Sequence, residues 1–476
     1  MLEVRKMSFK HALKWSFLSE LATKAIQPVI FIVLGRLLTP EDFGVMAAAM
    51  MVIAFSQIFW EAGMGKAFIQ RQTDIEEAAN AAFIINITLG AAIAGLLYAF
   101  AQTIAQGIYH DERVTAVLKA MTLQVMLGAL SSIQTAQLQK EMNFKKLFWV
   151  RLATISLPGL FSIPLAWNGM GYWALVAGTL VGQITQTIIL WKMSPWRPSL
   201  RVNMKITKEI GGFGTWVCLT ALLSWFYIWG DALIVSHFLG SRNLGLYRMA
   251  HQFSDLVYLL LFSPLLSVAY SYFSRISGDL ERIQQVITSA TILIIWAAIP
   301  LSLFVFIFSK NIESVLFGEK WIGLEFIIAY LSLRQGFAWV TALNGEVYRA
   351  MSKPQLESIV LLVSLFAYVP VYIATVQIDL IAFAQARLAL VILSLIGHMW
   401  LLNKITRISL RTVYKKLCFV VMIGFLAAWM LHKCLSVLEI DDLPQIALGY
   451  PIFMLIILSF FYYFKQQKYI FNIKGV

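Results

Sequence analysis

The sequence predicts an all-α polytopic membrane protein of about fourteen transmembrane helices: two six-helix lobes in a pseudo-twofold repeat and two additional C-terminal helices. Three observations support this fold class. Of the 476 residues, 59% are hydrophobic and only 13% are charged, whereas soluble domains have about 25% charged residues. The apolar residues form blocks as long as a helix needs to cross a bilayer, about 20 residues. One polar turn recurs 201 residues later.

Polar and turn residues separate these apolar blocks. Helices are therefore expected over residues 12–38, 43–64, 80–104, 115–138, 147–167, 171–191, 210–239, 244–272, 284–309, 323–347, 356–377, 380–402, 416–435 and 444–464. The first block is interrupted by Glu20, Lys24 and Gln27. We interpret it as an uncleaved helix rather than a signal peptide, because the apolar run is long and no small-residue cleavage pattern follows it.

Lysine and arginine are distributed unevenly between the two predicted sides. With the N-terminus inside, 27 of them lie in cytoplasmic segments and 8 in outer segments. Cytoplasmic loops of membrane proteins are enriched in these residues. We therefore expect both termini to be cytoplasmic, and we attribute the formal net charge of +13 to topology rather than to nucleic-acid binding.

The recurring turn is RLLTPEDFGVMAAAM at residues 36–50 and HFLGSRNLGLYRMAH at residues 237–251. At the offset of 201 residues, Gly44 falls on Gly245. Glycine at both positions is expected where two helices approach closely. LQKEMNF and VYRAMSK form a second, similar pair at an offset of 209 residues.

Two similar pairs in the same order indicate a duplicated six-helix unit, with both copies in the same orientation across the membrane. We place the N-terminal lobe at residues 1–208, the C-terminal lobe at residues 209–403 and the two additional helices at residues 404–476. In the recurring turns, Thr39 and Ser241 are suited to cap the following helix.

Several motifs resemble a known family. GRLLTPEDFG, FIQRQTDIEEAANAAFIIN, LQKEMNFKKL and VLFGEKWIG are similar to Wzx-type polysaccharide and lipid-linked oligosaccharide flippases of the MOP (MATE-like) superfamily, in the colanic-acid-exporter-like branch. The resemblance runs over essentially the whole chain. It implies two six-helix bundles around a central cavity, two extra C-terminal helices and alternating access.

The same resemblance implies a function and partners. The expected cargo is an undecaprenyl-diphosphate-linked oligosaccharide, moved from the inner to the outer leaflet of the bacterial inner membrane for cell-surface polysaccharide export. Membrane lipids and a polysaccharide polymerase or export machinery are the expected partners, and no nucleic acid is expected. No cofactor is expected either, and the coupling ion would be H⁺ or Na⁺.

Charged residues inside membrane helices suggest where a cargo would bind, because each costs about 2.5–3.5 kcal/mol to insert. The candidate cargo-binding cations are Lys24, Arg248, Arg334 and Arg387. A positively charged cavity would suit an anionic diphosphate. Alternatively, Lys24 pairs with Glu20 at i,i−4, Arg248 extends to the membrane surface, and Arg334 pairs with Glu325 or Glu346.

A second group of residues is the candidate coupling site. Arg248, His251 and Asp255 fall at i, i+3 and i+7 and therefore share one face of a helix. Asp255 lies deepest and is the candidate for binding a coupling proton or cation. Asp231 lies toward the outer end of the preceding helix, and Glu61 toward the cytoplasmic end of the second helix.

Catalysis is not expected. The sequence contains no P-loop, HExxH or nucleophile-elbow motif. Its three cysteines, Cys218, Cys418 and Cys434, have no metal-ligand spacing. Two alternatives to a lipid carrier stay open: a membrane enzyme that polymerises or ligates glycans, and a drug/cation antiporter of the same superfamily. The short predicted outer connection, 310–322, disfavours the enzyme, and the cationic residues disfavour the antiporter.

Overall fold

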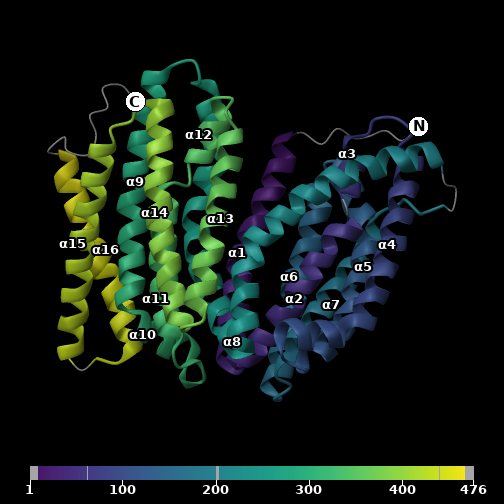
Figure 1. Ribbon diagram of the computed structural model, residues 1–476, viewed down its shortest axis with the longest axis horizontal. Coiled ribbons are helices and arrows are strands. Elements are labelled where there is room, and N and C mark those ends of the chain that lie inside the picture. Colours follow the sequence, from purple (N-terminus) through teal and green to yellow (C-terminus); the bar gives the residue numbers. More distant parts are fainter. Residues whose placement is uncertain (1–8, 62, 200–202, 439, 467–476) are drawn as a thin grey trace. The chain divides into compact units, whose positions relative to one another are not determined.

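The computed structural model describes residues 9–61, 63–199, 203–438 and 440–466, and every regular element in these ranges is helical (Figure 1). The long helices are α1 (Phe9–Leu37), α2 (Pro40–Glu61), α4 (Ile75–Ile104), α5 (Arg113–Lys140), α6 (Phe144–Trp167), α7 (Tyr172–Met193), α8 (Met204–Arg275), α9 (Leu280–Ile307), α11 (Leu324–Val340), α13 (Gln355–Val376), α14 (Leu380–Thr406), α15 (Leu410–Val437) and α16 (Asp442–Gln466). The short elements are α3 (Met64–Gln70), η1 (Ala105–Tyr109), α10 (Ser309–Ile312), η2 (Glu313–Phe317), η3 (Glu319–Trp321) and α12 (Asn344–Ala350).

Within the described residues, 12 helices are long and apolar enough to cross a membrane. This confirms the prediction of an all-α polytopic membrane protein, while the count of fourteen spans stays a prediction. The helices expected over 210–239 and 244–272 correspond to α8, which consists of two helices joined across a kink at Gly240, where φ is 75° and ψ is −177°. The sequence marked a turn here, and the structure has a kink.

Two further differences concern short elements. The seven-residue helix α3 lies where a loop was expected, because it is far too short to give a membrane-span pattern. The helix expected over 323–347 is divided into α11 and α12 by a turn. The other predicted helices coincide with single helices, whose ends differ by a few residues.

The chain divides into two units, Met1–Gly245 and Leu246–Val476. In the first unit, α6 packs against α1 and α7, and α5 packs against α2, α4 and α7. In the second unit, α9 packs against α11 and α15, α14 packs against α11 and α13, and α15 packs against α16. The predicted boundaries after residues 208 and 403 stay predictions.

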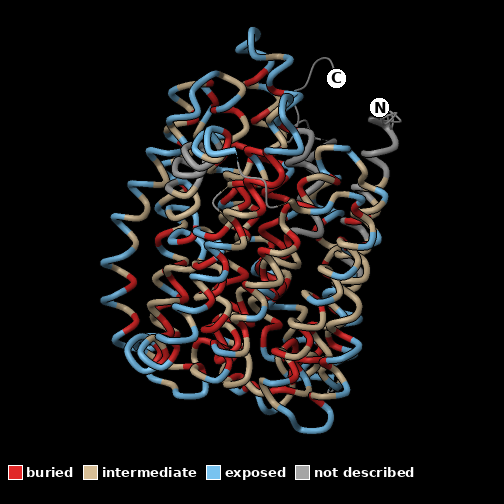
Figure 2. The backbone as a smooth tube through the Cα atoms, turned by 90° about the vertical axis from the view of Figure 1, so that its right-hand side faces the viewer, coloured by how far each residue is buried: buried red, intermediate tan, exposed pale blue. Residues whose placement is uncertain are grey.

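Burial changes from turn to turn along many of the helices (Figure 2). Helix α13, for example, leaves large apolar side chains exposed, among them Phe366 at 80%. Helix α9 instead buries most of its length. Exposed apolar helix faces of this kind suit contact with lipid, because in water they would be unfavourable.

The two recurring turns of the sequence contact each other within the first unit. A Cβ added at Gly44 would lie 1.8 Å from the carbonyl oxygen of Ser241, and one added at Gly245 would lie 1.7 Å from that of Pro40. Pro40 and Ser241 are also 201 residues apart, so they occupy equivalent positions in the two turns. The contact is therefore reciprocal: the glycine of each turn lies against the carbonyl group at the equivalent position of the other turn. Such mutual contact of equivalent residues is what a local twofold axis produces.

Candidate functional site

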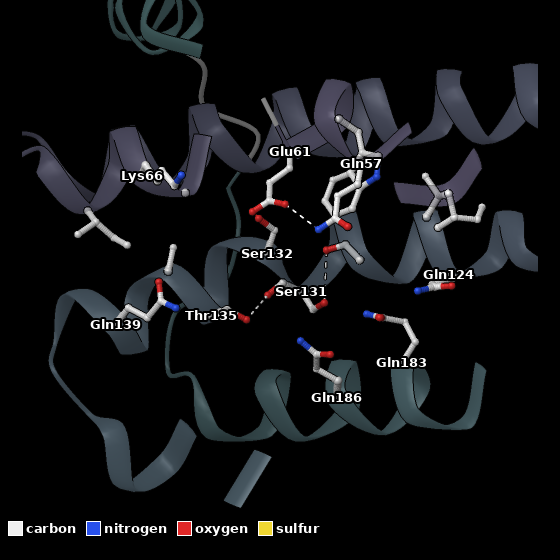
Figure 3. A pocket seen from close by; sticks show the side chains of 17 residues that line it. Gln57, Glu61, Lys66, Gln124, Ser131, Ser132, Thr135, Gln139, Gln183 and Gln186 are labelled. Atoms are coloured by element: carbon white, nitrogen blue, oxygen red, sulfur yellow. Dashed lines mark hydrogen bonds between the residues drawn. The ribbon is translucent and has the colours of Figure 1, made fainter. Parts of the chain in front are cut away.

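A cavity of about 400 Å³ lies among α2, α3, α5 and α7 in the first unit (Figure 3). Its walls are rich in uncharged polar groups. These are the amides Gln57, Gln124, Gln139, Gln183 and Gln186 and the hydroxyls Ser131, Ser132 and Thr135. Two charged residues, Glu61 and Lys66, and Trp60 complete its polar lining. We call this space the amide-lined cavity.

Helical spacing explains why these residues meet. In α5 the lining positions 124, 128, 131, 135 and 139 follow each other at intervals of three or four, and Ser132 lies beside Ser131, so they form one stripe. Gln57 and Glu61 in α2, and Gln183 and Gln186 in α7, are spaced in the same way. Three membrane helices therefore turn their polar stripes toward one space.

The hydrogen bonds made by the lining side chains leave much of their hydrogen-bonding capacity unused. Gln57 Nε2 donates to Glu61 Oε2 at 2.8 Å, and Ser131 Oγ donates to the carbonyl oxygen of Leu127 at 2.8 Å. Within the described chain, the buried indole Nε1 of Trp60 and Oε1 of Gln124 have no hydrogen-bond partner. A buried polar atom without a partner costs about 1–3 kcal/mol. Both atoms belong to residues that line the cavity, but each is itself buried in the cavity wall.

A second cavity of about 520 Å³ adjoins the first. Thr135, Gln139 and Gln186 line both spaces and so stand between them. The second cavity also contains Arg151, whose Nη1 donates to Ser19 Oγ at 3.5 Å. The polar region of the first unit thus extends from amide groups to a guanidinium.

Of the predicted site residues in the first unit, Glu61 lines the amide-lined cavity, and it is half-buried. Asp231 is buried, and its Oδ1 accepts a hydrogen bond from the amide N–H of Ala232 at 2.6 Å. The side chains of Glu20 and Lys24 lie outside the described residues, although their backbone belongs to α1. The predicted pairing of these two residues therefore stays a prediction.

In the second unit, two members of the predicted helix stripe contact each other. His251 Nδ1 and Asp255 Oδ2 are 3.0 Å apart, and the Asp255 side chain is 46% exposed. Arg248, one turn before His251 on the same helix, is partly buried. The spacing predicted one shared helix face, and the structure adds a contact between the imidazole and the carboxylate.

The two remaining predicted cations have different surroundings. Arg387 is only 5% exposed, and its guanidinium lies 5.5 Å from the ring centre of Tyr247 and 5.6 Å from that of Tyr372. Arg334 Nη1 donates to Gln335 Oε1 at 3.0 Å. Among the described ion pairs, none joins Arg334 to Glu325 or Glu346. Glu346 pairs with Arg349 instead.

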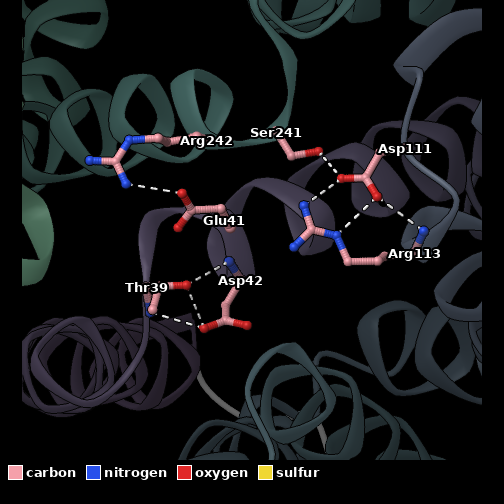
Figure 4. A network of polar contacts seen from close by, with 7 residues as sticks. All are labelled: Thr39, Glu41, Asp42, Asp111, Arg113, Ser241 and Arg242. Atoms are coloured by element: carbon pink, nitrogen blue, oxygen red, sulfur yellow. Dashed lines mark hydrogen bonds and ion pairs between the residues drawn. The ribbon is translucent and has the colours of Figure 1, made fainter.

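A polar network surrounds the contact between the recurring turns (Figure 4). Arg242 Nη1 and Glu41 Oε1 form an ion pair at 2.9 Å, and these residues are again 201 apart. Asp111 accepts hydrogen bonds from Arg113 and, at 2.5 Å, from Ser241 Oγ. Burial alone would raise the pKa of Asp111, but the bonds from Arg113 and Ser241 outweigh it, so the pKa is lowered.

The two predicted N-caps of the recurring turns differ. Thr39 caps α2 as expected: its N–H and hydroxyl both donate to Asp42 Oδ2, and the Asp42 N–H donates back to Thr39 Oγ1. For Ser241 the prediction was wrong: its hydroxyl donates to the Asp111 carboxylate, and among the described hydrogen bonds none joins this hydroxyl to a backbone N–H of the following helix.

The amide stripe was missed at the sequence level. The predicted site residues were mainly charged side chains, because charged groups are the costliest to place inside a membrane. The signal was nevertheless present in α5, where polar or small residues recur every three to four positions from Gln124 to Gln139.

Comparison with known proteins adds two findings. A family model described as "Polysaccharide biosynthesis protein" matches residues 33–326. The chain is 24% identical over 322 residues to the succinoglycan biosynthesis transport protein ExoT of Rhizobium meliloti (strain 1021), covering 68% of this chain and 65%, just under two thirds, of that protein. It is 24% identical over 413 residues to the teichuronic acid biosynthesis protein TuaB of Bacillus subtilis (strain 168), covering 85% and 84%.

Among solved structures, the fold is similar to that of the lipid II flippase MurJ in an inward closed conformation. The TM-score is 0.72 at 15% identity, over 94% of this chain and 99% of that one. An inward-facing multidrug resistance MATE transporter of the MOP superfamily gives a TM-score of 0.60 at 11% identity, over 81% and 96%. These similarities confirm the fold of the superfamily that the sequence motifs resemble, and the names describe transporters rather than enzymes.

Proposed function

The chain belongs to the polysaccharide biosynthesis protein family, and on that premise we propose that it carries a lipid-linked saccharide across a membrane. The observation that supports this most is the amide-lined cavity. Uncharged polar groups are expensive inside membrane helices unless they have partners, yet three helices direct them toward one space. A saccharide headgroup, which cannot cross a bilayer core unaided, would supply such partners.

The finer proposal concerns cargo and direction. We propose an undecaprenyl-diphosphate-linked oligosaccharide, moved from the inner to the outer leaflet of the bacterial inner membrane by alternating access. The resemblance of the chain's motifs to those of Wzx-type flippases supports this cargo. The excess of lysine and arginine in one set of loops supports cytoplasmic termini. A polysaccharide polymerase or export machinery would then receive the cargo.

We further propose that Lys24, Arg248, Arg334 and Arg387 contact the diphosphate, since charge-assisted bonds to phosphate are strong. Lys24→Ala is then expected to lower polysaccharide export roughly tenfold, about 1.4 kcal/mol, without lowering the amount of protein in the membrane. Export would be measured per unit of membrane protein, with Lys208→Ala as the control. Full export by Lys24→Ala would remove Lys24 from the mechanism.

An H⁺ or Na⁺ gradient is the proposed driving force, and the pair of Asp255 and His251 is the proposed ion-responsive group. A partly exposed carboxylate beside an imidazole can exchange a proton or bind a cation. Transport that is unchanged after both gradients are collapsed would contradict this coupling.

Deletion of the gene tests the proposed function. The expected result is accumulation of an undecaprenyl-linked oligosaccharide on the inner leaflet, together with loss of the surface polysaccharide. Lipid extraction and mass spectrometry would identify the accumulated oligosaccharide, and the intact gene supplied on a plasmid is the control. If no lipid-linked saccharide accumulates and sensitivity to cationic drugs rises instead, the antiporter alternative is favoured.

A further inference from the structure

Resting on the proposed function, we propose that the amide-lined cavity binds the uncharged sugar residues of the cargo, rather than its diphosphate. This assigns the cavity a chemical class of ligand: a hydroxyl-rich, neutral saccharide. The residues assigned to it belong to the first unit alone, and Arg248, Arg334 and Arg387 are not among them.

The composition of the walls supports a neutral ligand. Each sugar hydroxyl both donates and accepts hydrogen bonds, and each glutamine amide offers both a donor and an acceptor group. Phosphates instead select arginine, lysine or backbone N–H groups, because they only accept. Among the described lining residues there are five glutamines and one cation, the exposed Lys66, and the carboxylate of Glu61 lines the same space.

The size and shape of the space also agree. Its volume of about 400 Å³ falls in the range of small-ligand pockets, about 300–1,000 Å³. In Figure 3 the side chains of Gln124 from α5 and Gln183 from α7 extend into the same space from two helices. A sugar ring between them would contact both amides.

The test compares two probes on the full-length protein in nanodiscs: undecaprenyl diphosphate, and the same lipid bearing the oligosaccharide from the deletion strain. Wild type is expected to bind the glycosylated lipid about tenfold more tightly than the bare lipid. The double variant Gln124→Leu/Gln183→Leu should lose this tenfold preference while its affinity for the bare lipid stays unchanged. The exposed Gln106→Leu is the matched control and should keep the preference.

The outcomes separate the two proposals. Binding of neither probe by wild type would overturn the proposed function, and the sugar assignment with it. If the double variant binds both probes more weakly by the same factor, or binds both as tightly as wild type does, the sugar assignment alone is overturned. If the double variant fails to give a monodisperse preparation, Gln124→Asn and Gln183→Asn, which stay polar but shorten the reach, replace it. They should also lose most of the preference, and full retention by both would overturn the assignment.

Discussion

Gly44→Ala is expected to destabilise the protein by about 3 kcal/mol or more, the upper end for steric overpacking. Alanine normally stabilises a helix relative to glycine by about 1 kcal/mol. At Gly44 the added methyl group would lie 1.8 Å from the carbonyl oxygen of Ser241. A backbone atom cannot rotate away as a side chain can, so the two recurring turns would have to separate.

The measurement is the midpoint temperature of thermal unfolding of the detergent-solubilised protein, detected by fluorescence-detected size exclusion. Gly245→Ala should behave like Gly44→Ala, because its methyl group would lie 1.7 Å from the Pro40 carbonyl oxygen. Gly95→Ala is the matched control, since nothing lies within 4 Å of a Cβ there. A midpoint for Gly44→Ala equal to that of Gly95→Ala would show that the turns do not pack as described.

Lys140→Met is expected to release the C-terminal end of α3. Lys140 Nζ donates to the carbonyl oxygens of Phe68 and Ile69, at 3.1 Å each, and also to that of Arg71. Hydrogen bonds to a charged group contribute about 1.5–3 kcal/mol each, and methionine keeps the side-chain length without any donor. Because α3 supplies Lys66 and Ile69 to the amide-lined cavity, the loss should also reach the cavity wall.

Hydrogen–deuterium exchange would follow this change. In Lys140→Met the amides of residues 64–71 should exchange faster, by about tenfold for each 1.4 kcal/mol lost, while α9 in the second unit stays unchanged. Lys208→Met removes an exposed lysine and is the control. Unchanged exchange at residues 64–71 would mean that Lys140 does not hold α3.

The sequence was sufficient for the fold class and for the positions of most long helices, because apolar block length is a direct consequence of bilayer thickness. The repeat also identified Gly44 and Gly245 as equivalent. It did not reveal that they touch each other, because internal similarity carries no information on distance. Glu41 and Arg242 are a second pair of equivalent positions that contact each other. The repeat did not reveal this pair, because the two residues carry opposite charges and therefore show no identity.

The site was less predictable. Charged residues were predicted because of their insertion cost, and of those whose side chains the structure describes, only Glu61 lines the amide-lined cavity. Glutamine and serine in a membrane helix also satisfy themselves against their own backbone, as Ser131 does with Leu127, so their presence alone does not mark a site. Only the convergence of three stripes from α2, α5 and α7 distinguishes the cavity, and convergence is a property of packing.

The proposed transport of a lipid-linked saccharide is tested most directly by leaflet transfer in liposomes that contain only the purified protein. An undecaprenyl-diphosphate-linked oligosaccharide labelled on its sugar would be placed in one leaflet, and a membrane-impermeant glycosidase would report its arrival in the other. Transfer many times faster than in protein-free liposomes is the expected result. Transfer no faster than in protein-free liposomes, with or without an H⁺ or Na⁺ gradient, would contradict the proposed function.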